Sequence, residues 1–293
     1  MDALASLTDI NLDDLVNAFG WQHSPLLARL VRLIFFPTAC EFARQMLKFD
    51  SWIGSRGLAE AACLSERSYA REVRVFGMEH LPEGPTLLLA NHPGMTDTLA
   101  LFAAVARPDM KVIALDRPFL LSLPNLTGQL DFVTEQPHER AALVRRLVRH
   151  LRSGGSVLTF PAGHTEPDPA NYPGAVDSLE SWTDSIDVFV RMAPETAVVP
   201  ICIRGVTWAP TVNNPLVRMR RELLDRMLLS SALQLLSNVA LHARPVTITI
   251  QIGAPIYARE LGTTDMAVLH RAVLGSMKTL IETPPQGEGQ VLW

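Results

Sequence analysis

The length, composition and charge of this chain exclude several classes of protein. Its 293 residues are 48% hydrophobic, which is enough for a sizeable core in one large domain or two small ones. The formal net charge of −4 argues against a nucleic-acid binder, because such proteins normally carry a basic excess. Cys40, Cys63 and Cys202 are far apart and match neither a disulfide framework nor a zinc site, so they favour a reducing compartment. No His, Asp or Glu cluster has the spacing of metal ligands, and we expect no metal.

The first 70 residues are expected to form a helical segment. Residues 1–22 show no pattern that we can assign, whereas residues 24–70 have a basic, amphipathic helical pattern. The most apolar window, 26–36, contains Arg29 and Arg32 and ends at Pro37, so we expect no transmembrane helix. The N-terminus also lacks the pattern of a secretory signal. Two interpretations stay open: a helix pair packed on the core, or a segment lying on an anionic membrane.

From residue 73 the sequence alternates between strands and helices. Apolar runs predict strands at 73–76, 86–90, 111–115, 130–133, 156–160, 197–203 and 246–252. Helical periodicity predicts helices at 97–106, 137–152, 183–192, 216–240 and 264–281. This alternation is typical of an α/β fold with a mostly parallel, buried sheet flanked by helices. We therefore expect an α/β domain over residues 71–293, preceded by the helical segment 1–70.

His92 and Asp97 lie at one of the predicted strand-to-helix junctions. Positions five apart on a continuous helix point away from each other, but Pro93 and Gly94 favour a turn that lets the two side chains meet. A carboxylate on one ring nitrogen leaves the other nitrogen as a base, which could activate a hydroxyl brought by a substrate. The alternative is that Thr96 or Asp97 only caps the following helix.

The sequence around this pair resembles the glycerolipid acyltransferase superfamily, which includes the 1-acylglycerol-3-phosphate acyltransferases. Its His-x4-Asp signature matches His92 and Asp97, with Asn91 before them, and the lead-in 75–82 is similar to the first strand and glycine turn of the family. Later blocks are similar at Phe160-Pro161-Ala162-Gly163, at 198–201 with Pro200, and at 252–256. The resemblance covers roughly residues 70 to 260, with four blocks in order.

The resemblance implies transfer of a fatty acyl group from a thioester donor, acyl-CoA or acyl-carrier protein, to a hydroxyl of a lysophospholipid, glycerolipid or related acceptor. His92 would be the base and Asp97 its orienting carboxylate, without a covalent intermediate or a cofactor. Backbone N–H groups near residues 161–163 are candidates for the oxyanion site. The expected substrate-binding residues are Asn91, Lys111, Arg117, Phe160, Pro161, Ala162, Gly163, His164, Glu166 and Pro200. Family members often reach the bilayer through N-terminal helices, which implies peripheral contact with the cytoplasmic face of the cell membrane.

Two departures from the family pattern bear on the acceptor. Ala162 stands where the family has a glutamate, and the arginine that commonly follows is absent from the segment 164–168. The segment 132–135, ending in Glu135, also lacks an expected basic residue. Since an acceptor phosphate normally calls for Arg or Lys, we expect neutral-headed lysophospholipids or glycolipids rather than lysophosphatidic acid or glycerol phosphate. A hydrolase using the same pair and a non-catalytic lipid-binding protein remain as rival interpretations.

Overall fold

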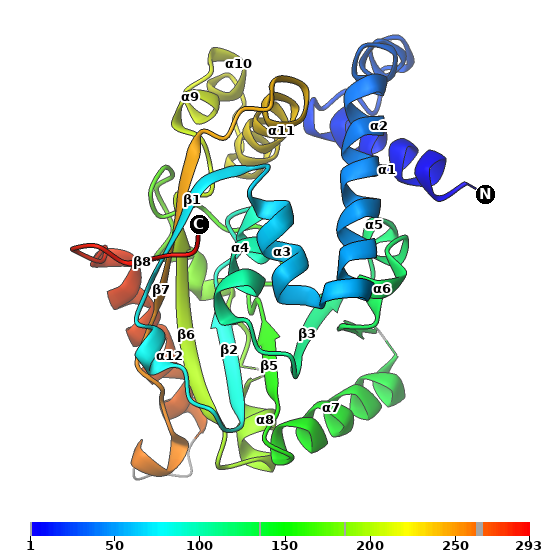
Figure 1. Cartoon of the computed structure of the whole chain (residues 1–293). Helices are drawn as coiled ribbons and strands as arrows, with labels where there is room; N and C mark the ends of the chain where they lie inside the picture. The colour runs from blue at the N-terminus through cyan, green and yellow to red at the C-terminus, as the bar shows by residue number, and fades with distance from the viewer. Residues whose placement is uncertain (1, 135, 185, 262–265) are drawn as a thin grey trace.

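A single mixed sheet lies at the centre of the structure (Figure 1), a computed structural model that describes residues 2–134, 136–184, 186–261 and 266–293. Over these residues the sheet has eight strands in the order β4-β3-β5-β2-β6-β7-β1-β8. The strands are β1 (Ala70–Phe76), β2 (Thr86–Ala90), β3 (Met110–Leu115), β4 (Leu130–Val133), β5 (Ser156–Thr159), β6 (Ala197–Arg204), β7 (Val246–Ile252) and β8 (Gln290–Val291).

Most strand pairs are parallel, as the alternating pattern predicted. The pairs β4–β3, β3–β5, β5–β2, β2–β6 and β7–β1 are parallel, whereas β6–β7 and β1–β8 are antiparallel. Every residue of β2 and β6 is buried, which explains why these central strands read as continuous apolar runs. The two-residue strand β8 is too short to leave a sequence signal and was not predicted.

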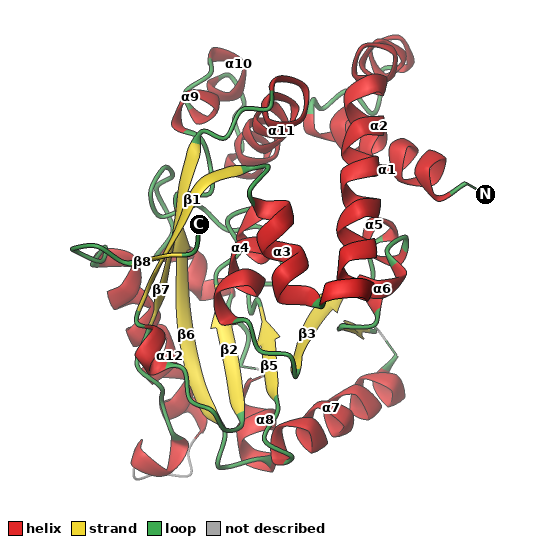
Figure 2. Ribbon diagram, viewed as in Figure 1, coloured by secondary structure: helices red, strands yellow, loops and turns green. Residues whose placement is uncertain are grey.

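Helices cover both faces of the sheet (Figure 2). The long helices are α1 (Ala3–Ala18), α2 (Pro25–Arg56), α3 (Leu58–Glu66), α4 (Met95–Val105), α7 (Pro137–Arg152), α8 (Ile186–Met192), α11 (Leu223–Leu241) and α12 (Met266–Glu282). Four-residue helices are α5 (Pro118–Leu121), α6 (Pro124–Thr127), α9 (Ala209–Val212) and α10 (Pro215–Arg218). One hydrophobic cluster joins the sheet to α2, α3 and α4, and a second joins its other face to α7, α8 and α12. The chain therefore has the three-layer α/β arrangement that was expected.

The N-terminal helices differ from the sequence-based expectation in two ways. Residues 3–18, left unassigned, form α1, and α2 runs without a break through Pro37. Pro37 lies on an exposed side of α2, where the carbonyl of Leu33 that loses its N–H partner can reach water. The C-terminal half of α2 packs on the sheet through Phe42, Met46 and Phe49, in the same cluster as Leu88 and Val199. The predicted division at residue 70 thus falls between helices and a sheet that share one core.

Further along the chain, the helix predicted over 216–240 is two helices, α10 and α11. Residues 219–222 separate them, and Arg220 there donates to the carbonyl of Phe19, which ties this break to the end of α1. The predicted helix 183–192 contains residue 185 and the predicted helix 264–281 begins with residues 264 and 265, all three outside the described ranges; the structure has α8 and α12 at these two places. Within the described residues, no helix is long and apolar enough to cross a bilayer.

Candidate active site

Three neighbouring strands, β5, β2 and β6, end at the same edge of the sheet, and the loops that follow them meet there. The chain leaves β2 at Asn91, β5 at Phe160 and β6 at Gly205. Loops at the carboxyl edge of parallel strands are the usual place for ligand sites in α/β folds, since the strands all present that edge to the same side. The following contacts connect these three loops.

His92 and Asp97 face each other across the turn at Pro93-Gly94. The Nδ1 atom of His92 lies 3.1 and 3.0 Å from the two carboxylate oxygens of Asp97. Asp97 is fully buried and also accepts hydrogen bonds from the N–H of Gly94 (2.8 Å) and the hydroxyl of Thr98 (2.8 Å). Asp97 therefore both caps α4 and orients His92, so the capping role and the orienting role of this carboxylate do not exclude each other.

The side chain of His92 is 29% exposed, and no described residue bonds its Nε2 atom, which is the nitrogen left to accept a proton. Burial disfavours the charged imidazolium, but the carboxylates of Asp97 and Glu166 outweigh this effect, so the pKa of His92 is raised above 6.5.

Burial also raises the pKa of the Cys202 thiol to about 11. Cys202 is thus a thiol at neutral pH and not a nucleophilic thiolate.

Asn91 fixes the backbone that carries His92. Its side-chain amide donates to the carbonyl of Ile203 (2.9 Å), and its side-chain carbonyl accepts from the N–H of Ile203 (2.7 Å). These bonds continue the β2–β6 pairing one step beyond Ala90, the last paired residue of β2. Asn91 is buried and uses its polar atoms within the protein.

The loop after β5 encloses His92 from the other side. The Phe160 ring packs against the imidazole with 4.7 Å between ring centres. Glu166, only 1% exposed, accepts a hydrogen bond from the N–H of His92 (3.1 Å), and its own N–H donates to the His92 carbonyl (2.8 Å). The carboxylate of Glu166 also accepts from Trp182 Nε1 (2.9 Å) and Ser178 Oγ (3.1 Å).

Asp168 ties the same loop to the segment that follows β6. Its carboxylate accepts from the N–H groups of Gly205 (2.9 Å) and Thr207 (2.8 Å) and from the Thr207 hydroxyl (2.9 Å). Asn171 adds a hydrogen bond to the Thr207 carbonyl (2.7 Å). The loop is therefore held in place by buried polar contacts at both Glu166 and Asp168.

Residues 160–164 form a tight turn beside His92. The N–H of Gly163 donates to the Phe160 carbonyl (3.0 Å), and Gly163 has φ +69°, a left-handed conformation that favours glycine. Pro161 is buried, Ala162 is half-buried and His164 is exposed, with its Nδ1 atom 3.2 Å from the Thr165 carbonyl. The turn thus contains five of the predicted substrate-binding residues and contacts the His92 ring through Phe160.

The other predicted residues make different contacts. Lys111 pairs in register with Val157, near the beginning of β5, and its Nζ donates to the Gly128 carbonyl (3.2 Å). Pro200 is buried within β6, where its carbonyl accepts from the N–H of Gly253 (2.8 Å). Arg117 is exposed after β3, close enough to Asp14 for their charges to interact. Glu135 lies outside the described residues.

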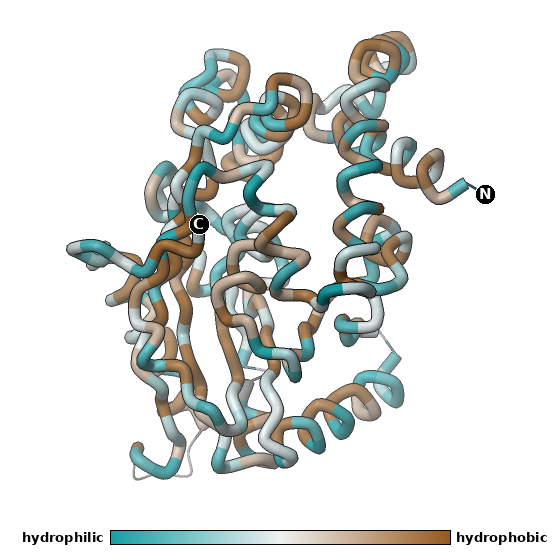
Figure 3. Tube along the Cα trace, in the orientation of Figure 1, coloured by the Kyte–Doolittle hydropathy of each residue, from teal (hydrophilic) through white to brown (hydrophobic). Residues whose placement is uncertain are grey.

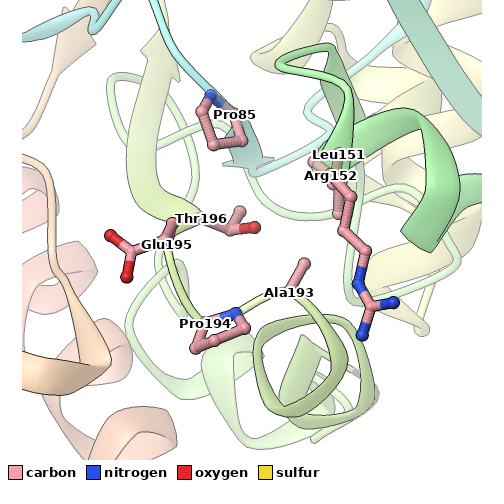
Figure 4. A pocket seen from close by; sticks show the side chains of 7 residues that line it. All are labelled: Pro85, Leu151, Arg152, Ala193, Pro194, Glu195 and Thr196. Carbon is pink, nitrogen blue, oxygen red and sulfur yellow. The ribbon is translucent and has the colours of Figure 1, made fainter.

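A cavity of about 130 Å³ lies at the opposite edge of the sheet, where β2 and β6 begin (Figure 4). Pro85, Leu151 and the segment 193–196 line it, together with Arg152. Since His92 follows the other end of β2, this cavity is separate from the candidate site. Within the described ranges, no group of three or more His, Cys, Asp or Glu side chains is arranged to hold a metal ion.

Sequence reasoning missed the residues that join the loops. Ser178, Trp182 and Thr207 gave no motif, because their roles depend on contacts with residues far away in the chain. Asp168 carried a weak signal: it stands between Pro167 and Pro169, which restrict the backbone on both sides. Glu66, fully buried at the end of α3, interacts electrostatically with Asp97 and had no sequence signal either.

Comparisons with known proteins give one family match and one similar solved structure. No curated protein matches the chain. A solved structure of the 1-acyl-sn-glycerophosphate (LPA) acyltransferase PlsC from Thermotoga maritima is 14% identical, with a TM-score of 0.45 over 96% of this chain and 100% of that one. The model of the Acyltransferase family matches residues 72–204, which include β2, β5 and β6 and the His92–Asp97 pair. Over these residues the chain is similar to the Acyltransferase family.

Proposed function

We propose that the protein is an O-acyltransferase of lipid biosynthesis that uses His92 as its base. It transfers a fatty acyl group from a thioester, acyl-CoA or acyl-carrier protein, to a hydroxyl of a lysophospholipid, glycerolipid or related acceptor. The observation that carries the proposal is the contact between His92 Nδ1 and the buried Asp97 carboxylate, at the shared edge of β5, β2 and β6. This contact leaves Nε2 to accept the proton of the acceptor hydroxyl.

The chemical step needs no group beyond the two substrates and this pair. The acceptor oxygen attacks the thioester carbonyl while His92 takes its proton, and Asp97 stabilises the imidazolium. When the tetrahedral intermediate collapses, the C–S bond breaks and the proton passes from His92 to the leaving thiolate. The products are the acylated acceptor and the free thiol.

The 160–163 turn supplies a candidate donor for the oxyanion. Pro161 has no N–H, and the N–H of Gly163 is used by the Phe160 carbonyl. The N–H of Ala162 has no partner among the described residues, which makes it the best donor of the three for a developing negative charge. The small side chain of Ala162 leaves access to this group.

The acceptor is proposed to have a neutral or zwitterionic head. Lys111 donates to the Gly128 carbonyl, and the buried Arg204 donates to the carbonyls of Leu280 and Ile281, so both cations are used within the protein. Arg117 and His164 are exposed at the loops after β3 and β5 and are proposed as polar contacts. One exposed arginine is a weak basis for binding a phosphate monoester.

We further propose peripheral attachment to the cytoplasmic face of a membrane. Large apolar side chains are exposed along α2 and around α10 and α11: Leu26, Leu30, Leu33, Ile34, Leu216, Met219, Leu224 and Leu228. We call this set the α2–α11 apolar surface; Figure 3 shows hydrophobic stretches on both helices. The two parts adjoin, because Val31, Val217 and Leu229 pack in one cluster beneath them. Exposed Arg29, Arg218 and Arg221 flank this surface and would attract anionic lipids.

The free thiols of Cys40, Cys63 and Cys202 fit a reducing compartment.

Release of thiol from palmitoyl-CoA tests the activity. Wild type and His92→Ala are compared with glycerol 3-phosphate, lysophosphatidic acid, a neutral-headed lysophospholipid and a glycolipid as acceptors. We expect acceptor-dependent release, fastest with the uncharged or zwitterionic heads, and at least about 100-fold slower in the variant.

Three other results would change the assignment. Release without any acceptor would indicate a hydrolase. No release from palmitoyl-CoA, followed by release from palmitoyl-acyl-carrier protein, would identify the carrier protein as the donor. No release from either donor, or equal rates in wild type and His92→Ala, would contradict the proposal.

A further inference from the structure

Glu166 holds both backbone polar groups of His92, although 74 positions separate the two residues. Its carboxylate Oε2 accepts the His92 N–H at 3.1 Å, and its own N–H donates to the His92 carbonyl at 2.8 Å. Asp97 contacts the ring of His92 but not its peptide groups. The ring and the backbone of His92 are thus fixed by two different carboxylate residues.

The partners of Glu166 fit its ionised form. The N–H of His92 points to Oε2 and the indole Nε1–H of Trp182 points to Oε1, and neither group can accept a hydrogen bond. Ser178 Oγ lies 3.1 Å from Oε1. Burial is the largest influence and raises the pKa of Glu166 above 4.5, while these hydrogen bonds and the charge of His92 oppose that rise. With both oxygens used by the protein, Glu166 has a structural reason to be buried that requires no substrate.

The charges around His92 come from three elements. Asp97 on α4 and Glu166 in the loop after β5 both favour the imidazolium. Glu66 at the end of α3 interacts with Asp97, but burial raises its pKa well above 4.5 and neither of its oxygens has a partner among the described residues. Asp97 and Glu166 are therefore the two carboxylates whose charges favour the imidazolium of His92.

We propose that Glu166 is a positioning residue for His92: its carboxylate fixes the His92 backbone and supplies a second negative charge that favours the imidazolium formed during proton transfer. This role replaces the acceptor contact expected for Glu166 from the sequence. The proposal rests on the proposed function only for the proton that His92 takes from the acceptor. The effect of Glu166 on the titration of His92 requires no substrate.

The experiment is an NMR titration of His92 in protein labelled at the histidine ring carbons. The His92 signal is assigned by its loss in His92→Asn, and the titration is run on wild type, Glu166→Gln and Asp168→Asn. Asp168 is the matched control, because it is equally buried on the same loop but bonds to Gly205 and Thr207 instead of His92. We expect a lower His92 pKa in Glu166→Gln and the wild-type pKa in Asp168→Asn.

Kinetics give a second readout. In Glu166→Gln we expect the acid limb of the kcat profile to move to lower pH with the His92 pKa, the plateau kcat to fall about tenfold and KM to stay within about twofold. An unchanged His92 pKa in Glu166→Gln, or an equal shift in Asp168→Asn, would overturn the proposal. If no variant or wild type transfers acyl groups, the proposed function fails while the titration still decides the role of Glu166.

A measurement on the wild-type protein covers the case in which Glu166→Gln does not fold. The indole N–H resonance of Trp182, assigned with Trp182→Phe, reports on the Glu166 carboxylate. Because the coupling between two charges is reciprocal, this resonance should shift with the same midpoint as His92. A Trp182 resonance that is flat through the titration of His92 would contradict the coupling.

Discussion

The buried acids around His92 differ in the hydrogen-bond donors that surround them. Asp97 is fully buried, yet it accepts bonds from His92, Gly94 and Thr98 and lies in the first turn of α4, where the helix dipole favours a negative charge. Glu66 is equally buried and has no donor among the described residues. The burial of Asp97 is therefore compensated by hydrogen-bond donors, whereas the burial of Glu66 is not and raises its pKa well above 4.5.

The raised pKa of His92 predicts the pH dependence of the reaction. A base must be neutral to accept a proton, so the rate should fall as pH drops through the His92 pKa. Because Asp97 and Glu166 raise this pKa, the acid limb of kcat/KM should have its midpoint above 6.5. A pH–rate profile with saturating thioester checks this, and a midpoint below 6.5 would contradict it.

The buried Glu66 predicts a pH-dependent gain of stability in Glu66→Gln. The unfolded chain ionises near pH 4.5, whereas the folded protein keeps the proton, so the wild type loses stability as pH rises from 4.5 toward the folded pKa. Glutamine has no such loss. We expect equal melting temperatures below pH 4.5 and a higher one for the variant at pH 8, by about 2–4 °C for each kcal/mol. A difference that is the same at both pH values would exclude ionisation as the cause.

Among the helices, α2 combines two environments in 32 residues. Its C-terminal half is part of the core, and Asp50 there accepts hydrogen bonds from Asn125 (2.9 Å) and the N–H of Leu126 (2.8 Å), which joins α2 to α6. Its N-terminal half exposes leucines, while Arg32 forms ion pairs with Asp9 and Asp13 of α1. The two halves of α2 therefore have different environments: the C-terminal half packs on the core, and the N-terminal half is exposed.

Pro37 lies between these halves, and Pro37→Ala is expected to stabilise the protein. Alanine restores the N–H that can bond the Leu33 carbonyl and removes the clash of the proline ring, for a gain of about 1–3 kcal/mol. Chemical denaturation followed by circular dichroism measures the change. A loss of stability would mean that a bend at Pro37 is needed for α2 to pack on both α1 and the sheet.

For the molecule as a whole, the α2–α11 apolar surface adjoins the loops of the candidate site, because Gln234 of α11 bonds the backbone of Val206 and Trp208 after β6. The site is formed where β5, β2 and β6 end, and the apolar surface is formed by helices joined through their own hydrophobic cluster. Leu33 and Met219 are each 77% exposed, so a change at these two side chains should alter membrane binding without altering the His92–Asp97 contact.

Vesicle sedimentation tests the surface. The double variant Leu33→Glu/Met219→Glu should bind phosphatidylglycerol-containing vesicles at least about tenfold more weakly than wild type, since two apolar side chains can no longer be buried in lipid. Leu241→Glu is the matched control: Leu241 is 75% exposed, against 77% for Leu33, but lies at the far end of α11. Equal binding by wild type and the double variant, or equal weakening in the control, would refute membrane contact through this surface.

The seven longer strands and most helices could be predicted because their signals are local. The continuous apolar run of β2 and the 3.6-residue period of α7 are present in the chain itself. The turn at Pro93-Gly94 also has a local signal, which is why the meeting of His92 and Asp97 could be anticipated. The path of α2 through Pro37 could not be predicted, because the core contacts of α2 and the access of water to the Leu33 carbonyl outweigh the tendency of proline to end a helix.

The sequence by itself determined the α/β class, the position of the strand-to-helix junction and the His92–Asp97 pair, since each depends on residues a few positions apart. Only the tertiary structure decided that Glu166 bonds the His92 backbone and that Asp168 bonds the segment after β6. It also decided that Lys111 pairs with Val157 of β5 and that Pro200 pairs with Leu89 of β2. These facts follow from which strands lie side by side. That order is set by packing between distant segments, and no local pattern encodes it.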